Sequence, residues 1–173
     1  MRELADSDRI RLFMRTFGAE ARAEARAYLT GGATAVLLGW RRSTIDIDIK
    51  IVPEHDHLLR ALPQIKEELR VNVELASPAD FIPVPAGWEE RSRFQVQEGK
   101  VAFYHFDLYA QAMAKVERRH VQDIEDVTTM IRMGLIVPER ARQYFETIAP
   151  ELYRYPAVDP RAFRAAVEEM LKS

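Results

Sequence analysis

A chain of 173 residues can form one domain with a buried core, or a domain with an appended helical part. It contains no cysteine, which excludes disulfides, thiolate metal sites and a cysteine nucleophile. Its formal net charge of −2 argues against broad electrostatic attraction to nucleic acid. No apolar run approaches the roughly 20 residues of a membrane span, and residues 1–17 lack a signal-peptide core. We therefore expect a cytoplasmic protein without membrane contact.

The first half of the chain mixes helical and extended patterns. Residues 8–29 carry an apolar stripe followed by alanines, which predicts one or two helices. A short helix over 33–38 and a strand over 44–52 follow. The next helix is expected over 57–69, and Pro63 inside it predicts a kink or a restart.

The next segments alternate apolar and polar residues. A strand is expected over 71–75, and residues 94–96 and 101–106 are typical of a hairpin that turns near Gly99. From Asp107 onward the spacing of apolar residues is that of helices.

These elements predict an α+β fold. We expect a small mixed β-sheet core flanked by helices over residues 1–106, and a helical C-terminal region over 107–173 that packs on it in one compact unit. Pro138 and Pro160 occupy first-turn positions of two of its helices.

The strand over 44–52 carries two aspartates one residue apart. Residues i and i+2 of a strand point to the same face, so Asp46 and Asp48 project side by side. Adjacent carboxylates repel each other, and a divalent cation such as Mg²⁺ or Mn²⁺ would compensate for that repulsion. The alternative is an edge strand whose polar face, with Thr44 and Lys50, is simply solvated.

A pair of glycines precedes this strand. Gly31 and Gly32 open the short helix over 33–38, and Gly39 follows it. Backbone N–H groups at such a turn favour a phosphate group, although a glycine pair also makes ordinary turns. The order of glycine turn, short helix and Asp-x-Asp strand is much more specific than either part alone.

This arrangement resembles the first motif of the polymerase-β-like nucleotidyltransferase superfamily, and most closely its AbiEii-like and MenT-like toxin branch. The residues that carry the resemblance are Gly31, Gly32, Ala35, Leu38, Gly39, Arg41 or Arg42, Ser43, Thr44, Asp46 and Asp48. The resemblance implies a nucleotidyltransferase core, an NTP substrate, a magnesium or manganese cofactor, an RNA (such as tRNA) or protein acceptor, and a partner antitoxin.

Nucleotidyl transfer commonly uses a third carboxylate beside the Asp pair. Glu74 is the best candidate, because it is polar in an alternating apolar strand and shares a face with Asn72. Alternatively, Glu74 points into water at the end of the strand. Asp80 and Asp107 are the fallback candidates.

The segment 115–126 resembles a later motif of the toxin branch, with a lysine on a helix, an arginine one turn on and then an aspartate. An ammonium at Lys115 would stabilise the leaving pyrophosphate, and Arg119 would add a bidentate contact. Asp123 would hold one of these cations or cap the next helix. The alternative is the solvated face of an amphipathic helix.

Four side chains beside the strand are candidates for phosphate contacts. Ser43 and Thr44 carry hydroxyl donors, and Arg41 and Arg42 lie at the strand entrance. Each also fits a simple turn, strand or surface role.

Two further groups of residues are better explained by helix capping and core packing than by a functional site. His55 and His57 flank Asp56, and helix capping by the aspartate accounts for them better than a metal site that lacks a third ligand. The aromatic residues fit core packing better than a base-stacking platform. These are Phe103, Tyr104, Phe106 and Tyr109.

The leading hypothesis is therefore a metal-dependent nucleotidyltransferase in which Asp46, Asp48 and Glu74 hold the metal. Two alternatives stay open: an inactive nucleotide-binding or interaction module, and an enzyme that modifies a small molecule of the antibiotic type.

Overall fold

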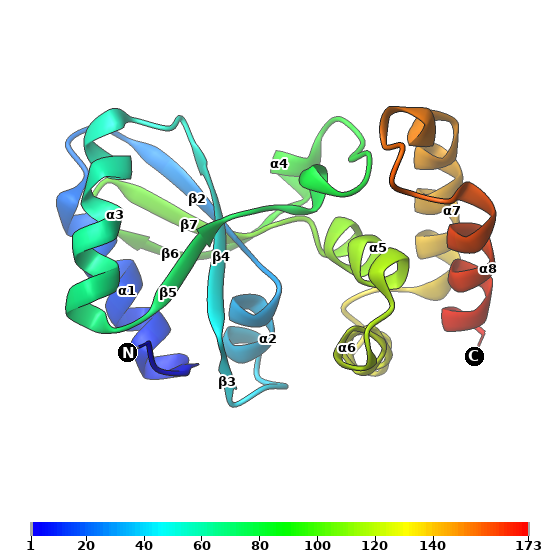
Figure 1. Ribbon diagram of the computed structural model, residues 1–173, viewed down its shortest axis with the longest axis horizontal. Coiled ribbons are helices and arrows are strands. Elements are labelled where there is room, and N and C mark those ends of the chain that lie inside the picture. The colour runs from blue at the N-terminus through cyan, green and yellow to red at the C-terminus, as the bar shows by residue number, and fades with distance from the viewer. Residues whose placement is uncertain (1, 173) are drawn as a thin grey trace. The chain divides into compact units, whose positions relative to one another are not determined.

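The computed structural model describes residues 2–172, in which the chain forms two compact units. The first unit contains the residues up to Ser77 together with Ser92–Phe106. The second contains Pro78–Arg91 together with the residues from Asp107 onward. The fold is α+β, with a mixed five-stranded sheet, eight α-helices within residues 2–172 and a helical C-terminal region (Figure 1).

Every strand found within residues 2–172 belongs to the first unit. Its elements in chain order are β1 (Ala5–Asp6), α1 (Ser7–Glu20), β2 (Ala25–Thr30), α2 (Gly32–Leu38), β3 (Ser43–Thr44), β4 (Asp46–Val52), α3 (Asp56–Leu69), β5 (Asn72–Leu75), β6 (Arg93–Glu98) and β7 (Val101–His105). The five-stranded sheet has the order β5-β4-β2-β7-β6, and β1 pairs with β3 separately.

The sheet is mixed because its central strands run in both directions. Strand β2 is antiparallel to β4 and parallel to β7, whereas β4 is parallel to β5 and β6 is antiparallel to β7. The expected hairpin between β6 and β7 is confirmed, and Gly99 lies in its turn with a φ of 56°.

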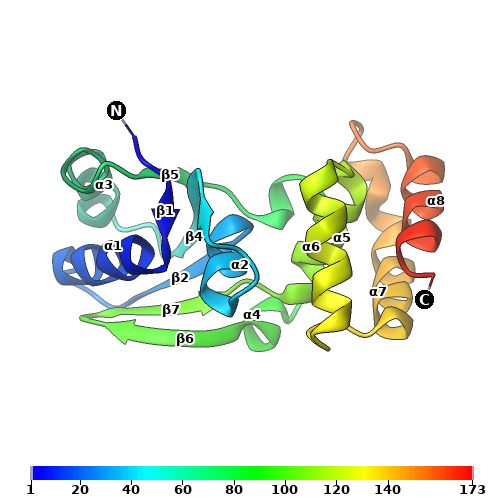
Figure 2. The same ribbon diagram turned by 90° about the horizontal axis from the view of Figure 1, so that it is seen from below.

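One face of this sheet forms the core of the first unit. The alternating isoleucines of β4 are buried on it, and they pack with α1 and α3, which lie side by side in Figures 1 and 2. Phe13 and Phe17 of α1 stack with ring centroids 5.4 Å apart, and Phe17 meets Phe103 of β7 edge-on. The opposite face therefore carries the polar members of the same strands.

The helical expectation is wrong over residues 25–29, which form the central strand β2. The sequence Ala25-Arg26-Ala27-Tyr28-Leu29 has good local helix formers, but β2 pairs with strands on both sides and is almost wholly buried. Pairing and burial override local propensity here. Helix α3 also runs through Pro63 without a restart.

The second unit is helical. Its elements are the 3₁₀ turn η1 (Pro78–Asp80), α4 (Trp88–Arg91), α5 (Leu108–Arg118), α6 (Val121–Arg132), α7 (Pro138–Ile148), the 3₁₀ segment η2 (Ala149–Arg154) and α8 (Pro160–Met170). The expected first-turn positions of Pro138 and Pro160 are confirmed. Phe145 of α7 and Phe163 of α8 pack edge-to-face with centroids 4.9 Å apart. Within residues 2–172, no helix has both the length and the apolar character that crossing a membrane requires.

Candidate functional site

Acidic side chains gather on the polar face of the sheet in the first unit. Asp46 and Asp48 of β4 are half-buried and alternate with buried isoleucines, so they share this face. The parallel register places Asp46 beside Asn72 and Asp48 beside Glu74 of β5. Residues paired across neighbouring strands point to the same side, so three carboxylates and an amide lie on one patch of sheet.

The amide of Asn72 connects two of these acids. Its Nδ2 donates a hydrogen bond to Asp46 Oδ1 and another, 3.2 Å long, to Glu74 Oε1. Because both of its protons are used in this way, Asn72 fixes the two carboxylates relative to each other and offsets part of their mutual repulsion.

A glycine corner meets the acidic patch directly. Gly31 precedes α2 with a φ of 62° and a ψ of −129°, a conformation that residues with a side chain rarely adopt. A Cβ at Gly31 would lie 3.2 Å from Asp48 Oδ2, so the bare backbone approaches the carboxylate closely. A ligand held by Asp48 would therefore also lie next to the backbone of this turn.

The second glycine makes room for the strand entrance. A Cβ at Gly32 would overlap the hydroxyl of Thr44 and lie 2.5 Å from Thr44 Cβ. That hydroxyl donates its proton to the carbonyl oxygen of Asp46 over 3.0 Å. Thr44 thus shapes the corner, while Ser43 pairs with Asp6 between β3 and β1 and Arg42 is exposed.

The donor set fits a small divalent cation that is completed by substrate. Within residues 2–172, no group of three or more histidine, aspartate or glutamate side chains is arranged to hold a metal ion by itself. Mg²⁺ is usually held by one or two carboxylates, with waters and substrate phosphates supplying the other ligands. Asp46 and Asp48 supply such a pair, and the backbone of Gly31, which has no side chain, lies beside Asp48.

A buried histidine contacts α2 behind the glycine corner, and no pattern in the sequence pointed to it. His105, at the end of β7, has no exposed surface. Its Nδ1 lies 3.0 Å from Thr34 Oγ1 in α2, and its Nε2 lies 2.8 Å from Gln95 Oε1 in β6. Burial, together with the nearby positive charge of Arg93, lowers the pKa of His105 to about 4. The neutral imidazole therefore ties α2 to the sheet.

Lys115 lies in the second unit and is engaged in ion pairs. Its side chain is buried, and Nζ lies 2.7 Å from Asp126 Oδ2 and 3.8 Å from Asp123 Oδ1. The pairing with Asp126 was missed because α5 and α6 come together only in the folded helical unit.

Asp123 caps α6, which is one of the roles expected for it, but its closest cation partner is Arg118, with Lys115 Nζ 3.8 Å away. It accepts two hydrogen bonds from Arg118 and one from the backbone N–H of His120, which caps α6. Burial opposes its charge, but Arg118 and Lys115 outweigh this effect and lower the pKa of Asp123. Arg119 is exposed and ends α5 with a φ of 57°.

The two fallback acids also lie in the second unit. Asp80 is exposed in η1, whereas Asp107 is 1% exposed and caps α5 by accepting the N–H of Tyr109. Arg91 Nε and the Tyr144 hydroxyl both donate to Asp107 Oδ2, at 2.8 and 3.0 Å.

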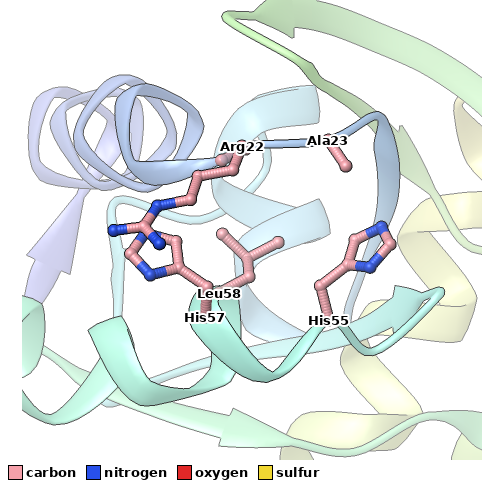
Figure 3. Close-up of a pocket in the computed structure, with 6 residues that line it drawn as sticks. Arg22, Ala23, His55, His57 and Leu58 are labelled. Carbon is pink, nitrogen blue, oxygen red and sulfur yellow. The ribbon is translucent and has the colours of Figure 1, made fainter.

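Figure 3 shows the two histidines considered in the sequence, with Leu58 between them in the view. They line a small cavity of about 190 Å³ with Ala21, Arg22, Ala23 and Leu58. His55 Nε2 lies 3.1 Å from the carbonyl oxygen of Glu24, and His57 Nε2 lies 3.8 Å from Glu20. His55 rather than Asp56 is the N-cap residue of α3, so the expected cap is displaced by one residue.

Comparison with known proteins gives one family match. The model of the family described as "Nucleotidyltransferase of unknown function (DUF6036)" matches residues 14–149, which include the glycine corner, the acidic patch and Lys115. No curated protein and no solved structure matches the chain.

Proposed function

Since the chain belongs to the nucleotidyltransferase family DUF6036, we propose that it transfers a nucleoside monophosphate from an NTP to an acceptor hydroxyl with Mg²⁺ or Mn²⁺ as cofactor. The observation that carries this proposal is the approach of the Gly31 backbone to the Asp48 carboxylate. This approach joins the two halves of the motif, the glycine turn and the acid pair, in one place.

The acids have separate roles in the proposed site. Asp46 and Asp48 would hold the metal ion, which when bound neutralises the triphosphate and orients it. Glu74 is exposed beside Asp48 and is tied to the patch by Asn72. An exposed carboxylate at this position suits a general base for the acceptor hydroxyl.

The proposed step forms one bond to phosphorus and breaks one. The acceptor oxygen forms a bond to the α-phosphorus of the NTP, and the bond from that phosphorus to the bridging oxygen of the β-phosphate breaks. The proton of the acceptor hydroxyl passes to Glu74, and pyrophosphate leaves. The Gly31–Gly32 turn allows the phosphates to lie against backbone rather than side chain.

The acceptor class follows from the resemblance to the toxin branch, which points to RNA, including tRNA, or to protein. A toxin would arrest growth when expressed alone, and a cognate antitoxin would relieve that arrest. Arrest by the parent chain together with normal growth on Asp46→Ala expression would support this role. If the parent chain and the Asp46→Ala variant both arrest growth, the toxicity does not depend on the acid pair and the proposed role is refuted.

Transfer is tested with NTPs labelled at the α-phosphate. Purified protein is incubated with each of the four NTPs, Mg²⁺ and either cellular RNA or cellular protein, and label in the macromolecule is counted. We expect transfer by the parent and loss in Asp46→Asn and Asp48→Asn. Asp56→Asn is the matched control, because Asp56 is exposed in α3. Equal transfer by Asp48→Asn, or no transfer from any NTP, would refute the proposal.

A further inference from the structure

A cavity of about 470 Å³ opens within the helical unit, and Asp107 is one of the residues that line it. It is lined by Arg91, Asp107, Leu108, Tyr109, Leu135, Arg140, Gln143, Tyr144 and Thr147. Its size falls in the range of pockets that hold small organic ligands. Its lining combines aromatic rings and apolar side chains with a few polar groups, among them two arginines, as ligand pockets commonly do.

The buried acid of the cavity is already neutralised. Asp107 accepts hydrogen bonds from Arg91 and Tyr144, and Arg91 also donates to the carbonyl oxygens of Pro85 and Ala86. Burial and the neighbouring Asp107 raise the pKa of Tyr144, which keeps its hydroxyl protonated. The charges of Arg91 and Asp107 therefore cancel, and neither has to be satisfied by a ligand.

Two tyrosines that stack on each other form one wall of the cavity. The rings of Tyr109 and Tyr144 are nearly parallel, with centroids 6.0 Å apart and an angle of 24° between their planes. The guanidinium carbon of Arg91 lies 5.8 Å from the centroid of the Tyr144 ring on the same wall. Both side chains are half-buried, so packing holds them in place while part of each stays exposed to a ligand.

One face of α7 brings a further positive charge to the cavity. Arg140, Gln143, Tyr144 and Thr147 follow the i, i+3, i+4, i+7 spacing and therefore line one side of the helix. Arg140 is exposed and forms no ion pair with any other residue of the described part of the chain. Since the charges of Asp107 and Arg91 cancel, the lining of the cavity has one remaining positive charge, that of Arg140. A guanidinium can donate two parallel hydrogen bonds to a phosphate.

We propose that this cavity binds a nucleoside monophosphate, with the base against the Tyr109–Tyr144 wall and the phosphate on Arg140. We infer an aromatic base because the wall consists of aromatic rings. We infer a single phosphate because Arg140 is the one guanidinium of the lining that no carboxylate among residues 2–172 compensates. Gln143, which lines the cavity from the same face of α7, adds an amide that can form hydrogen bonds with a polar edge of the base or sugar. This inference does not depend on the transfer reaction assigned to the first unit.

The test is calorimetric titration of the full chain in EDTA, which removes metal-dependent nucleotide binding at the acid pair. The probes are the four ribonucleoside 5′-monophosphates, the matching nucleosides and inorganic phosphate. We expect at least one monophosphate to bind saturably, and its nucleoside and inorganic phosphate to bind at least about tenfold more weakly. Arg140→Ala should weaken binding by about tenfold or more, as expected for a lost charge-assisted contact.

Two variants make the result specific. Arg161→Ala removes an exposed arginine of α8 that does not line the cavity, and it should bind like the parent. Asp48→Asn alters the acid pair and should also leave this binding unchanged. The proposal is overturned if no monophosphate binds, if phosphate binds as tightly as the monophosphate, if Arg140→Ala binds like the parent, or if Asp48→Asn abolishes binding.

Discussion

Replacing Lys115 by methionine separates a structural role of this side chain from a contact with the triphosphate. Methionine keeps most of the apolar stem but removes the ammonium that lies 2.7 Å from Asp126. Asp123 retains Arg118, so the carboxylate that loses its cation is that of Asp126, which has no exposed surface.

The expected loss in the free energy of unfolding is large because the carboxylate of Asp126, left without its cation, is buried. Removing one partner of a buried ion pair typically costs about 3–5 kcal/mol. Gln122 still donates a 3.2 Å hydrogen bond to Asp126, which places the estimate near the lower end, at about 3 kcal/mol. In a chain of this length, that loss lowers Tm by roughly 6–12 °C.

The measurement is urea unfolding followed by circular dichroism, with NTP binding measured on the same samples. Lys66→Met in α3 is the matched control, since Lys66 forms no ion pair with any residue between 2 and 172, and it should cost little. The double variant Lys115→Met/Asp126→Leu should be more stable than Lys115→Met, because no buried carboxylate is then left without a cation. If Lys115→Met unfolds like the parent but no longer binds NTP, the argument for a structural ion pair fails.

Three further outcomes follow from the first unit. Asp46→Asn and Asp48→Asn should each abolish the Mg²⁺-dependent rise in Tm on addition of NTP without lowering the Tm of the free protein; a retained rise would place the metal elsewhere. Gly32→Ala should lower the free energy of unfolding by roughly 1–3 kcal/mol through its overlap with Thr44, and adding Thr44→Gly should recover part of that loss; no change on Gly32→Ala would contradict the close approach. Because the pKa of His105 is lowered in the folded chain, this imidazole binds a proton below about pH 6.5 in the unfolded chain but only below about pH 4 in the folded chain. Stability should therefore fall by about 3 kcal/mol between these values, and urea titrations of His105→Gln should show a shallower fall.

The parts of the site that are local in sequence were predictable. A period of two is enough to place Asp46 and Asp48 on one face, and the pair Gly31–Gly32 precedes them closely in the sequence. The contact between Gly31 and Asp48 was not predictable from spacing alone. It depends on the antiparallel pairing of β2 with β4, which sets Thr30 directly opposite Asp48 and brings the next residue to the carboxylate.

The errors arose where tertiary structure overrides local preference. Residues 25–29 have the composition of a helix, but the sheet needs a central strand there. The partners of Lys115 and His105 come from other elements, and nothing in the periodicity of α5 or β7 distinguishes a paired cation or a neutral imidazole. Such side chains are identified by what surrounds them, which a single sequence does not reveal.

The chain enters the helical unit at Pro78, leaves it after Arg91 and returns at Asp107, so neither unit is a continuous stretch of polypeptide. A single cut at any peptide bond therefore cannot release two complete units. A fragment of residues 1–106 would contain Arg91 but not Asp107, which accepts its hydrogen bond. A fragment of residues 107–173 would contain Asp107 but not the segment that supplies Arg91. Dissection of this protein has to proceed by point substitution rather than by truncation.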